Sequence, residues 1–147
     1  IDPAIALIMQ KQLKKTPNEM EKILNKKSGL LALSGINSDM RIIREKAMKK
    51  NKKALLAIEI FGYHLAKSIG AFTATLNGLD CLIFTGGIGE NAWYIRKNVC
   101  EYLEFLGLAI DSSKNKKNAF EIHAPKRRVK ILVIPTDEEL AMAEKIW

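Results

Sequence analysis

The most informative stretch of the chain reads Asp80-Cys81-Leu82-Ile83-Phe84-Thr85-Gly86-Gly87-Ile88-Gly89-Glu90-Asn91. Residues 80–85 are an apolar run of strand length and predict a buried strand, and an amphipathic helix is expected over residues 92–103. Glycines between a strand and a helix let the backbone approach a ligand closely, and the helix N-terminus presents free N–H groups. The unit predicts a nucleotide- or phosphate-binding loop. Its alternative is an ordinary tight turn, because the glycine spacing fits neither a P-loop nor a dinucleotide fingerprint.

Two capped helices are predicted at the start of the chain. Asp2 precedes Pro3 and can cap a helix that ends near residue 14. Thr16 and Glu19 form a capping box around Pro17, which predicts a second helix ending before Ser28. Both signals are local, so they do not depend on the rest of the fold.

The region before the glycines contains the longest helical pattern. Residues 30–38 are apolar and rich in turn formers, and Ser38 can cap a helix over residues 39–49. Apolar residues then recur at helical spacing over residues 52–76, with small residues four apart. Such a stripe favours close packing against another helix.

The region after the glycines mixes short strands with polar turns. Strands are expected over residues 106–110 and 129–134, with a polar or single helical turn over 113–118. Thr136 begins another capping box, which predicts a terminal helix to Trp147. Helices that alternate with apolar strands indicate an α/β layered fold. Only two or three strands can be counted, so the first strands of the sheet are expected upstream of residue 1.

Composition limits the classes of protein that fit. A chain of 147 residues with 48% hydrophobic content suits one domain or part of one. The net charge of +8 raises nucleic acid, a membrane surface and phosphorylated small molecules as partners. The basic runs contain no interleaved aromatic residues, which favours solvated loops over nucleic-acid binding.

The cysteines and the apolar runs indicate the compartment. Cys81 and Cys100 lack the spacing of a disulfide framework or a zinc site, which favours a reducing cytoplasm. No apolar run approaches the roughly 20 residues that cross a bilayer, so no membrane association is expected.

The run over residues 83–91 resembles the adenosine-binding motif of acetate kinases, members of the actin, sugar-kinase and heat-shock ATPase superfamily. Further blocks resemble the same family in the same order, and together they span essentially all 147 residues. They are Ile1-Asp2-Pro3, Ser28-Gly29-Leu30-Leu31, Leu33-Ser34-Gly35, Ser38-Asp39-Met40-Arg41, Leu103-Glu104-Phe105-Leu106-Gly107 and Val133-Ile134-Pro135-Thr136-Asp137-Glu138-Glu139. The resemblance implies a partial ribonuclease H-like (actin-like ATPase) domain, a single incomplete domain over residues 1–147.

The resemblance also implies a reaction and a set of binding residues. Acetate kinases transfer the γ-phosphoryl group of ATP reversibly to acetate, giving acetyl phosphate and ADP with Mg²⁺. Their nucleoside pocket matches Asp39, Met40, Arg41, Gly86, Gly87, Ile88, Gly89, Glu90 and Asn91 here, and their glutamate near the metal matches Glu138. Asp39 and Glu138 also have a simpler interpretation, because acidic residues favour the first turn of a helix.

The same resemblance indicates what the chain lacks. No residue here matches the family's acetate site, its catalytic arginines and aspartate or its phosphate-binding hairpins, which are expected upstream. No catalytic residue is therefore assigned, and the isolated chain is expected to be inactive. Acetate is expected to bind only through that upstream part, and a homodimer through this end of the chain is implied. The alternatives are a sibling propionate or butyrate kinase and a non-catalytic basic binding domain.

Overall fold

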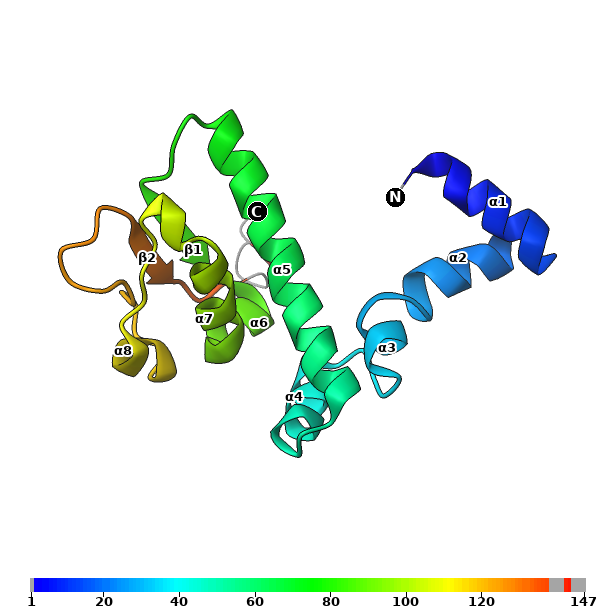
Figure 1. Ribbon diagram of the computed structural model, residues 1–147, viewed down its shortest axis with the longest axis horizontal. Helices are drawn as coiled ribbons and strands as arrows, with labels where there is room; N and C mark the ends of the chain where they lie inside the picture. The colour runs from blue at the N-terminus through cyan, green and yellow to red at the C-terminus, as the bar shows by residue number, and fades with distance from the viewer. Residues whose placement is uncertain (1, 138–141, 144–147) are drawn as a thin grey trace. The chain divides into compact units, whose positions relative to one another are not determined.

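The computed structural model describes residues 2–137 and 142–143 (Figure 1). The chain divides into two compact units, Ile1–Ile58 and Glu59–Trp147. Helices and strands are mixed, as the sequence predicts. The expectation of a single incomplete domain stays a prediction. The predicted terminal helix, with Glu138 and Glu139, lies largely outside the described residues.

The first unit begins with the two helices that the capping signals predict. Helix α1 (Pro3–Leu13) starts after Asp2, whose Oδ1 accepts a 2.8 Å hydrogen bond from the Ala4 backbone N–H. Helix α2 (Pro17–Lys26) starts with a complete capping box. The Glu19 N–H donates to Thr16 Oγ1 at 3.3 Å, and the Thr16 N–H donates to Glu19 Oε2 at 2.9 Å. Both predictions are confirmed.

The segment between α2 and the next predicted helix differs from expectation. Residues expected to form turns contain a short helix, α3 (Gly29–Ser34), which ends where Gly35 adopts a left-handed φ of 64°. Helix α4 (Met40–Met48) follows, and its N-cap is Asp39 rather than Ser38. The shift has a physical cause, because the Asp39 carboxylate accepts from the Arg41 backbone N–H at 2.8 Å.

The core of the first unit lies among α3, α4 and the start of α5 (Lys52–Thr75). Its fully buried side chains are small or β-branched, which allows the helices to approach closely. The buried members are Ile43, Ala47, Ala54 and Ala57, with Leu30, Leu33, Ile36 and Ile58 packed against them.

The second unit is organised around two parallel strands, β1 (Cys81–Phe84) and β2 (Lys130–Val133). On its other side β2 carries an antiparallel bridge between Glu121 and Leu132, and a further bridge joins His123 to Ile110. The predicted strand over residues 106–110 is therefore wrong, since it contributes a single bridge. A 3-10 turn, η1 (Glu104–Leu106), occupies its beginning.

Strand β1 is buried on only one of its two faces. Side chains alternate between the faces of a strand, and Phe84 is buried whereas Ile83 is 51% exposed. The prediction of a strand is confirmed, but its burial is only partial, because Ile83 lies on an exposed face.

The glycine run and the chain after it form three helices, of which the helix over residues 92–103 and a helical turn near residues 113–118 were predicted. Gly86–Asn91 is itself a short helix, α6, which corrects the predicted open loop. Helices α7 (Trp93–Tyr102) and α8 (Ser112–Lys116) follow. The core of this unit combines α7 with the sheet, and its members are at most 4% exposed: Ile95, Val99, Cys100, Leu103, Leu108, Ile122, Val129, Ile131 and Val133.

Helix α5 corrects one statement made from the sequence. Its 24 residues make it, within the described part of the chain, a helix long and apolar enough to cross a membrane. That observation is weak evidence, because the helix also makes specific polar contacts with α7. Glu59 accepts hydrogen bonds from the Tyr102 hydroxyl and, at 3.3 Å, from Asn98 Nδ2. Gly62 lies so close to Asn98 that a Cβ there would be 1.7 Å from Oδ1.

Candidate nucleoside-binding site

The carboxyl ends of β1 and β2 lie side by side, and the segments that follow them are joined. The Ile134 N–H donates to the Phe84 carbonyl oxygen at 2.9 Å, and Thr85 Oγ1 donates to the Ile134 carbonyl oxygen at 2.7 Å. Helix α6 and residues 134–137 therefore emerge together at one edge of the sheet. Ligands of open α/β sheets bind outside the carboxyl ends of the strands, so this edge is the candidate site.

The three glycines of α6 have different physical roles. Gly86 has a φ of 69°, which an L side chain rarely adopts. A Cβ added at Gly89 would lie 3.2 Å from the Phe84 carbonyl carbon, so this glycine allows α6 to pack on β1. A Cβ added at Gly87 would meet nothing within 4 Å. Gly87 is thus the position in α6 where neither the fold nor the backbone conformation demands glycine.

The other α6 residues form hydrogen bonds within α6 and with the segment that follows β2. Glu90 Oε1 accepts from the Thr136 N–H at 3.0 Å and from its hydroxyl at 3.3 Å. Asn91 Nδ2 donates to the Gly87 carbonyl oxygen at 3.0 Å, and Ile88 is half-buried. A cavity of about 260 Å³ opens beside them, lined by Glu90, Asn91, Asn118, Phe120, Val133 and Pro135.

Arg96 is an important residue that the sequence analysis missed. Its side chain is fully buried, and its guanidinium donates to the carbonyl oxygens of Gly89 and Glu90 at 2.7 and 2.8 Å. Burial lowers the pKa of Arg96 from its ordinary value. A signal was available, because Arg96 sits at helical spacing among Ala92, Val99 and Cys100 on the apolar face of α7.

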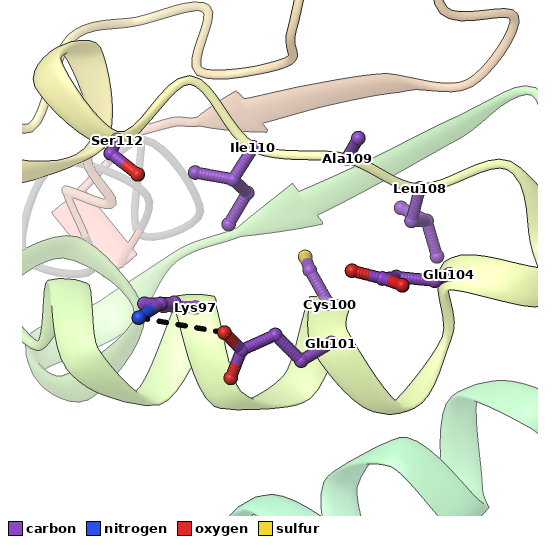
Figure 2. A pocket seen from close by; sticks show the side chains of 8 residues that line it. All are labelled: Lys97, Cys100, Glu101, Glu104, Leu108, Ala109, Ile110 and Ser112. Carbon is purple, nitrogen blue, oxygen red and sulfur yellow. Dashed lines mark ion pairs between the residues drawn. The ribbon is translucent and has the colours of Figure 1, made fainter.

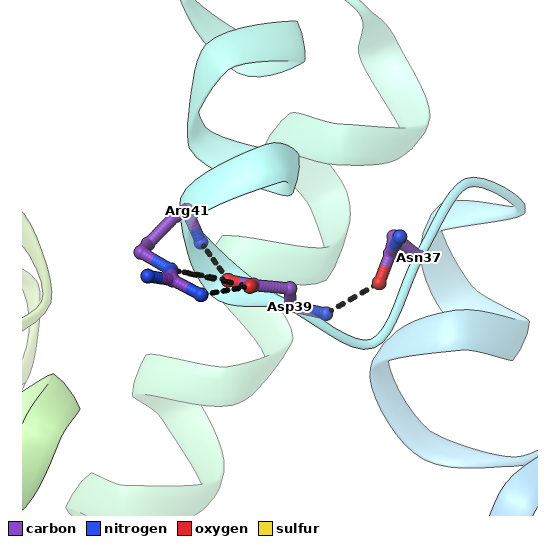
Figure 3. Close-up of polar contacts among 3 residues, drawn as sticks. All are labelled: Asn37, Asp39 and Arg41. Carbon is purple, nitrogen blue, oxygen red and sulfur yellow. Dashed lines mark hydrogen bonds and ion pairs between the residues drawn. The ribbon is translucent and has the colours of Figure 1, made fainter.

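The second segment of the predicted pocket, residues 39–41, lies in the first compact unit (Figure 3). Arg41 Nη2 is 2.6 Å from Asp39 Oδ2, and Arg41 Nε donates to both carboxylate oxygens at 3.1 Å. These bonds and the Arg41 backbone N–H lower the pKa of Asp39 to about 2. The Asp39 backbone N–H is held in turn by Asn37 Oδ1 at 2.9 Å.

The side chains of this segment differ in accessibility. The Arg41 side chain is 89% exposed, whereas Met40 is 5% exposed and so has little surface to offer a base. The capping interpretation of Asp39 is confirmed, and its contact with a nucleoside stays a prediction.

A different cavity in the second unit, of about 160 Å³, contains none of the predicted site residues (Figure 2). Lys97 and Glu101 form a 3.5 Å ion pair on α7 at its rim. Burial raises the pKa of the Cys100 thiol to about 12, so the thiol is neutral and unreactive. This cavity has no feature that indicates catalysis.

The residues described by the structure include no group of three or more His, Cys, Asp or Glu side chains that could hold a metal ion. Glu138, the predicted metal residue, lies outside them.

Comparison with known proteins identifies the family. Residues 1–144 match the Acetokinase family, and the chain belongs to it. It is 50% identical over 145 residues to the acetate kinase of Pseudothermotoga lettingae and 47% identical to that of Clostridium botulinum (strain Loch Maree / Type A3). Each match covers 97% of this chain and 36% of the relative, so the chain spans about a third of the length of these relatives. The resemblance seen in the sequence is confirmed.

Solved structures of the same family resemble the fold of this chain. The acetate kinase of Porphyromonas gingivalis gives a TM-score of 0.91 at 35% identity, covering 99% of this chain and 37% of that one. A propionate kinase from Francisella tularensis gives a TM-score of 0.91 at 42% identity with the same coverage.

Proposed function

We propose that this chain is the nucleoside-binding part of an acetate kinase, an enzyme that transfers the γ-phosphoryl group of ATP to acetate and forms acetyl phosphate and ADP. The observation that carries the proposal is the glycine run of a known family, at the carboxyl ends of two parallel strands, fixed there by Glu90 and Arg96. Gly86–Asn91 and residues 39–41 contact the nucleoside in this proposal.

The isolated chain binds adenine nucleotide weakly and does not turn over. Phosphoryl transfer depends on cations that neutralise the moving group. Arg41 gives its guanidinium to Asp39, and Arg96 gives its guanidinium to carbonyl and amide oxygens. The proposal therefore assigns no catalytic role to either arginine and places the cations that neutralise the phosphoryl group in the part of the family's enzymes that matches no residue here.

The remaining parts of the proposal follow from the family resemblance. Mg²⁺ is held near Glu138, acting directly or through water. The complete enzyme is a cytoplasmic homodimer of ribonuclease H-like domains, of which this chain contributes one incomplete part, and neither nucleic acid nor a membrane is a partner.

Propionate is the second candidate acceptor. The specific observation in its favour is the 42% identity to a propionate kinase of known structure. Because acyl specificity is expected outside this chain, a comparison of acetate and propionate belongs in the complete enzyme.

The test measures acetyl phosphate formation from Mg-ATP and acetate in two samples. One is the 147-residue chain, and the other is a chimaera in which this chain replaces the matching 145 residues of the Pseudothermotoga lettingae enzyme. We expect turnover from the chimaera alone. Robust turnover by the isolated chain would place catalytic groups where the proposal has none, and a folded chimaera that binds no ADP would contradict the nucleoside site.

A further inference from the structure

We propose that Asn118 is a positioning residue for nucleotide binding, which acts through the Arg96 guanidinium to hold the end of the glycine helix α6 in place. The inference rests on the proposed nucleoside site. It assigns a binding role to a residue on the chain after α8, 22 positions away from Arg96 in sequence.

Arg96 is a buried cation whose hydrogen-bond acceptors, within the described part of the chain, are all neutral oxygens. Its relative exposure is 0%, and its guanidinium is satisfied by neutral oxygens. Nη1 donates to the Gly89 and Glu90 carbonyl oxygens at 2.7 and 2.8 Å, while Nη2 donates to Asn118 Oδ1 at 2.6 Å. Asn115 accepts the two remaining bonds at 2.7 Å, with its Oδ1 from Nε and its carbonyl oxygen from Nη2. A buried charge is tolerated only when its donors are satisfied in this way.

The guanidinium acts as the C-terminal cap of α6. The last carbonyl groups of a helix have no partner inside the helix, and a cation is favoured beside them. Arg96 satisfies two of these carbonyls, those of Gly89 and Glu90. Since the Glu90 carboxylate in turn holds Thr136, a displacement of the guanidinium would reach both segments at the carboxyl edge of the sheet.

The segment that carries Asn118 is itself anchored. Asp111 caps α8 by accepting from the Ser113 and Lys114 N–H groups at 2.9 and 3.0 Å. Asn115 is 1% exposed and donates to the Trp93 carbonyl oxygen at 2.9 Å. Asn118 has a φ of 51°, a conformation that asparagine and glycine tolerate. The α8 segment is therefore a fixed support, and Asn118 is its accessible end.

The geometry at Asn118 permits a clean substitution. Asn118→Gly keeps the left-handed backbone and removes the side chain with its Oδ1 acceptor, whereas Asn118→Asp keeps an acceptor and adds a charge opposite to that of Arg96. Lys117→Ala, at the neighbouring exposed position, is the matched control. Arg96→Lys is a harsher variant, because an ammonium cannot reach all five acceptor contacts.

The experiment measures two quantities on the 147-residue chain: ADP affinity by calorimetry and amide hydrogen exchange at Ala92 and Ile122. The Ala92 N–H donates to the Ile88 carbonyl oxygen at 2.9 Å and reports opening of α6, while the Ile122 N–H, bonded to Ile131 at 2.9 Å, reports the sheet. For Asn118→Gly we expect exchange at Ala92 and the Kd for ADP each to rise on the order of tenfold, as the loss of one hydrogen bond to a charged group implies. We expect exchange at Ile122 to stay unchanged in Asn118→Gly. We expect Asn118→Asp to keep both the Kd for ADP and the exchange rate at Ala92 at the parental values.

Two results would overturn the positioning role alone. One is a parent chain that binds ADP and an Asn118→Gly variant that binds it equally well. The other is an equal rise in exchange at Ala92 and Ile122, which would make Asn118 a general stabilising residue. A parent chain with no ADP affinity would contradict the proposed function itself and remove the positioning role with it.

Discussion

Substitution of the three glycines of α6 separates binding from folding. Gly86, Gly87 and Gly89 share one six-residue helix, yet the structure assigns each a different constraint. We predict that Gly87→Val abolishes measurable adenine-nucleotide binding while leaving the fold intact, because the added side chain enters space that the fold leaves open.

The expected magnitudes follow from the surroundings of each Cα. At Gly87 an added Cβ has no neighbour within 4 Å, so Gly87→Ala leaves the free energy of unfolding unchanged or raises it by up to about 1 kcal/mol through helix propensity. At Gly89 an added Cβ would be 3.2 Å from the Phe84 carbonyl carbon, and overpacking of this kind costs about 1–3 kcal/mol. At Gly86 the φ of 69° makes Gly86→Ala cost about 1–2 kcal/mol in backbone strain.

The assay combines urea unfolding with ADP titration for each variant. The two variants are predicted to differ in which property they lose. Gly87→Val loses ADP affinity by at least about tenfold, or 1.4 kcal/mol, and keeps a normal free energy of unfolding, whereas Gly89→Ala has a lower free energy of unfolding. Gly87→Ala, the smaller change at the same position, gives an intermediate affinity. Unchanged ADP affinity in a folded Gly87→Val variant would refute the nucleoside site at α6.

Three further predictions concern charge, reactivity and assembly. The folded-state pKa of Asp39 is lowered to about 2 from an ordinary 3.8, so its stabilising contribution is full above about pH 4 and is lost as the pH falls toward 2. The difference in melting temperature between the parent and Asp39→Asn should therefore shrink over that range. A constant difference would contradict the Asp39–Arg41 pairing. Cys100, with a pKa of about 12, should not react with iodoacetamide at pH 8 until denaturant is added, and rapid labelling of the native chain by peptide mapping would disprove its burial. The apolar side chains that α5 exposes, Leu56 at 52% and Phe72 at 67% among them, should support a dimer at high micromolar concentration, and sedimentation showing only monomer would argue against it.

Local signals in the sequence were sufficient for much of the fold. The caps at Asp2 and Thr16 act over two and three residues, and the apolar pattern of α5 is longer than an ordinary strand, so these elements follow from the sequence alone. The helix over residues 40–48 also follows from the sequence, although its N-cap is Asp39 and not the predicted Ser38.

The errors arise where tertiary contacts decide the local structure. The glycine run forms a helix because Arg96 caps its end and Gly89 can lie on β1, and neither contact is visible from glycine propensity. The predicted strand over 106–110 is instead a 3-10 turn ending at Gly107, whose φ of 87° interrupts an extended backbone, followed by a single bridge from Ile110 to His123. The spacing of Arg96 on the apolar face of α7 was a local signal of its burial, but its contacts with Asn115 and Asn118, 19 and 22 residues away, could not be predicted from the sequence.

The central claim is that the chain carries the nucleoside contacts of the enzyme in α6 and residues 39–41. An NMR titration of the isotopically labelled 147-residue chain with ADP tests it most directly, because each amide reports separately. The account predicts saturable shifts at the amides of residues 86–91 and 39–41 that persist at raised salt. Shifts confined to the basic runs and lost with salt, or the absence of any shift at residues 86–91, would contradict it.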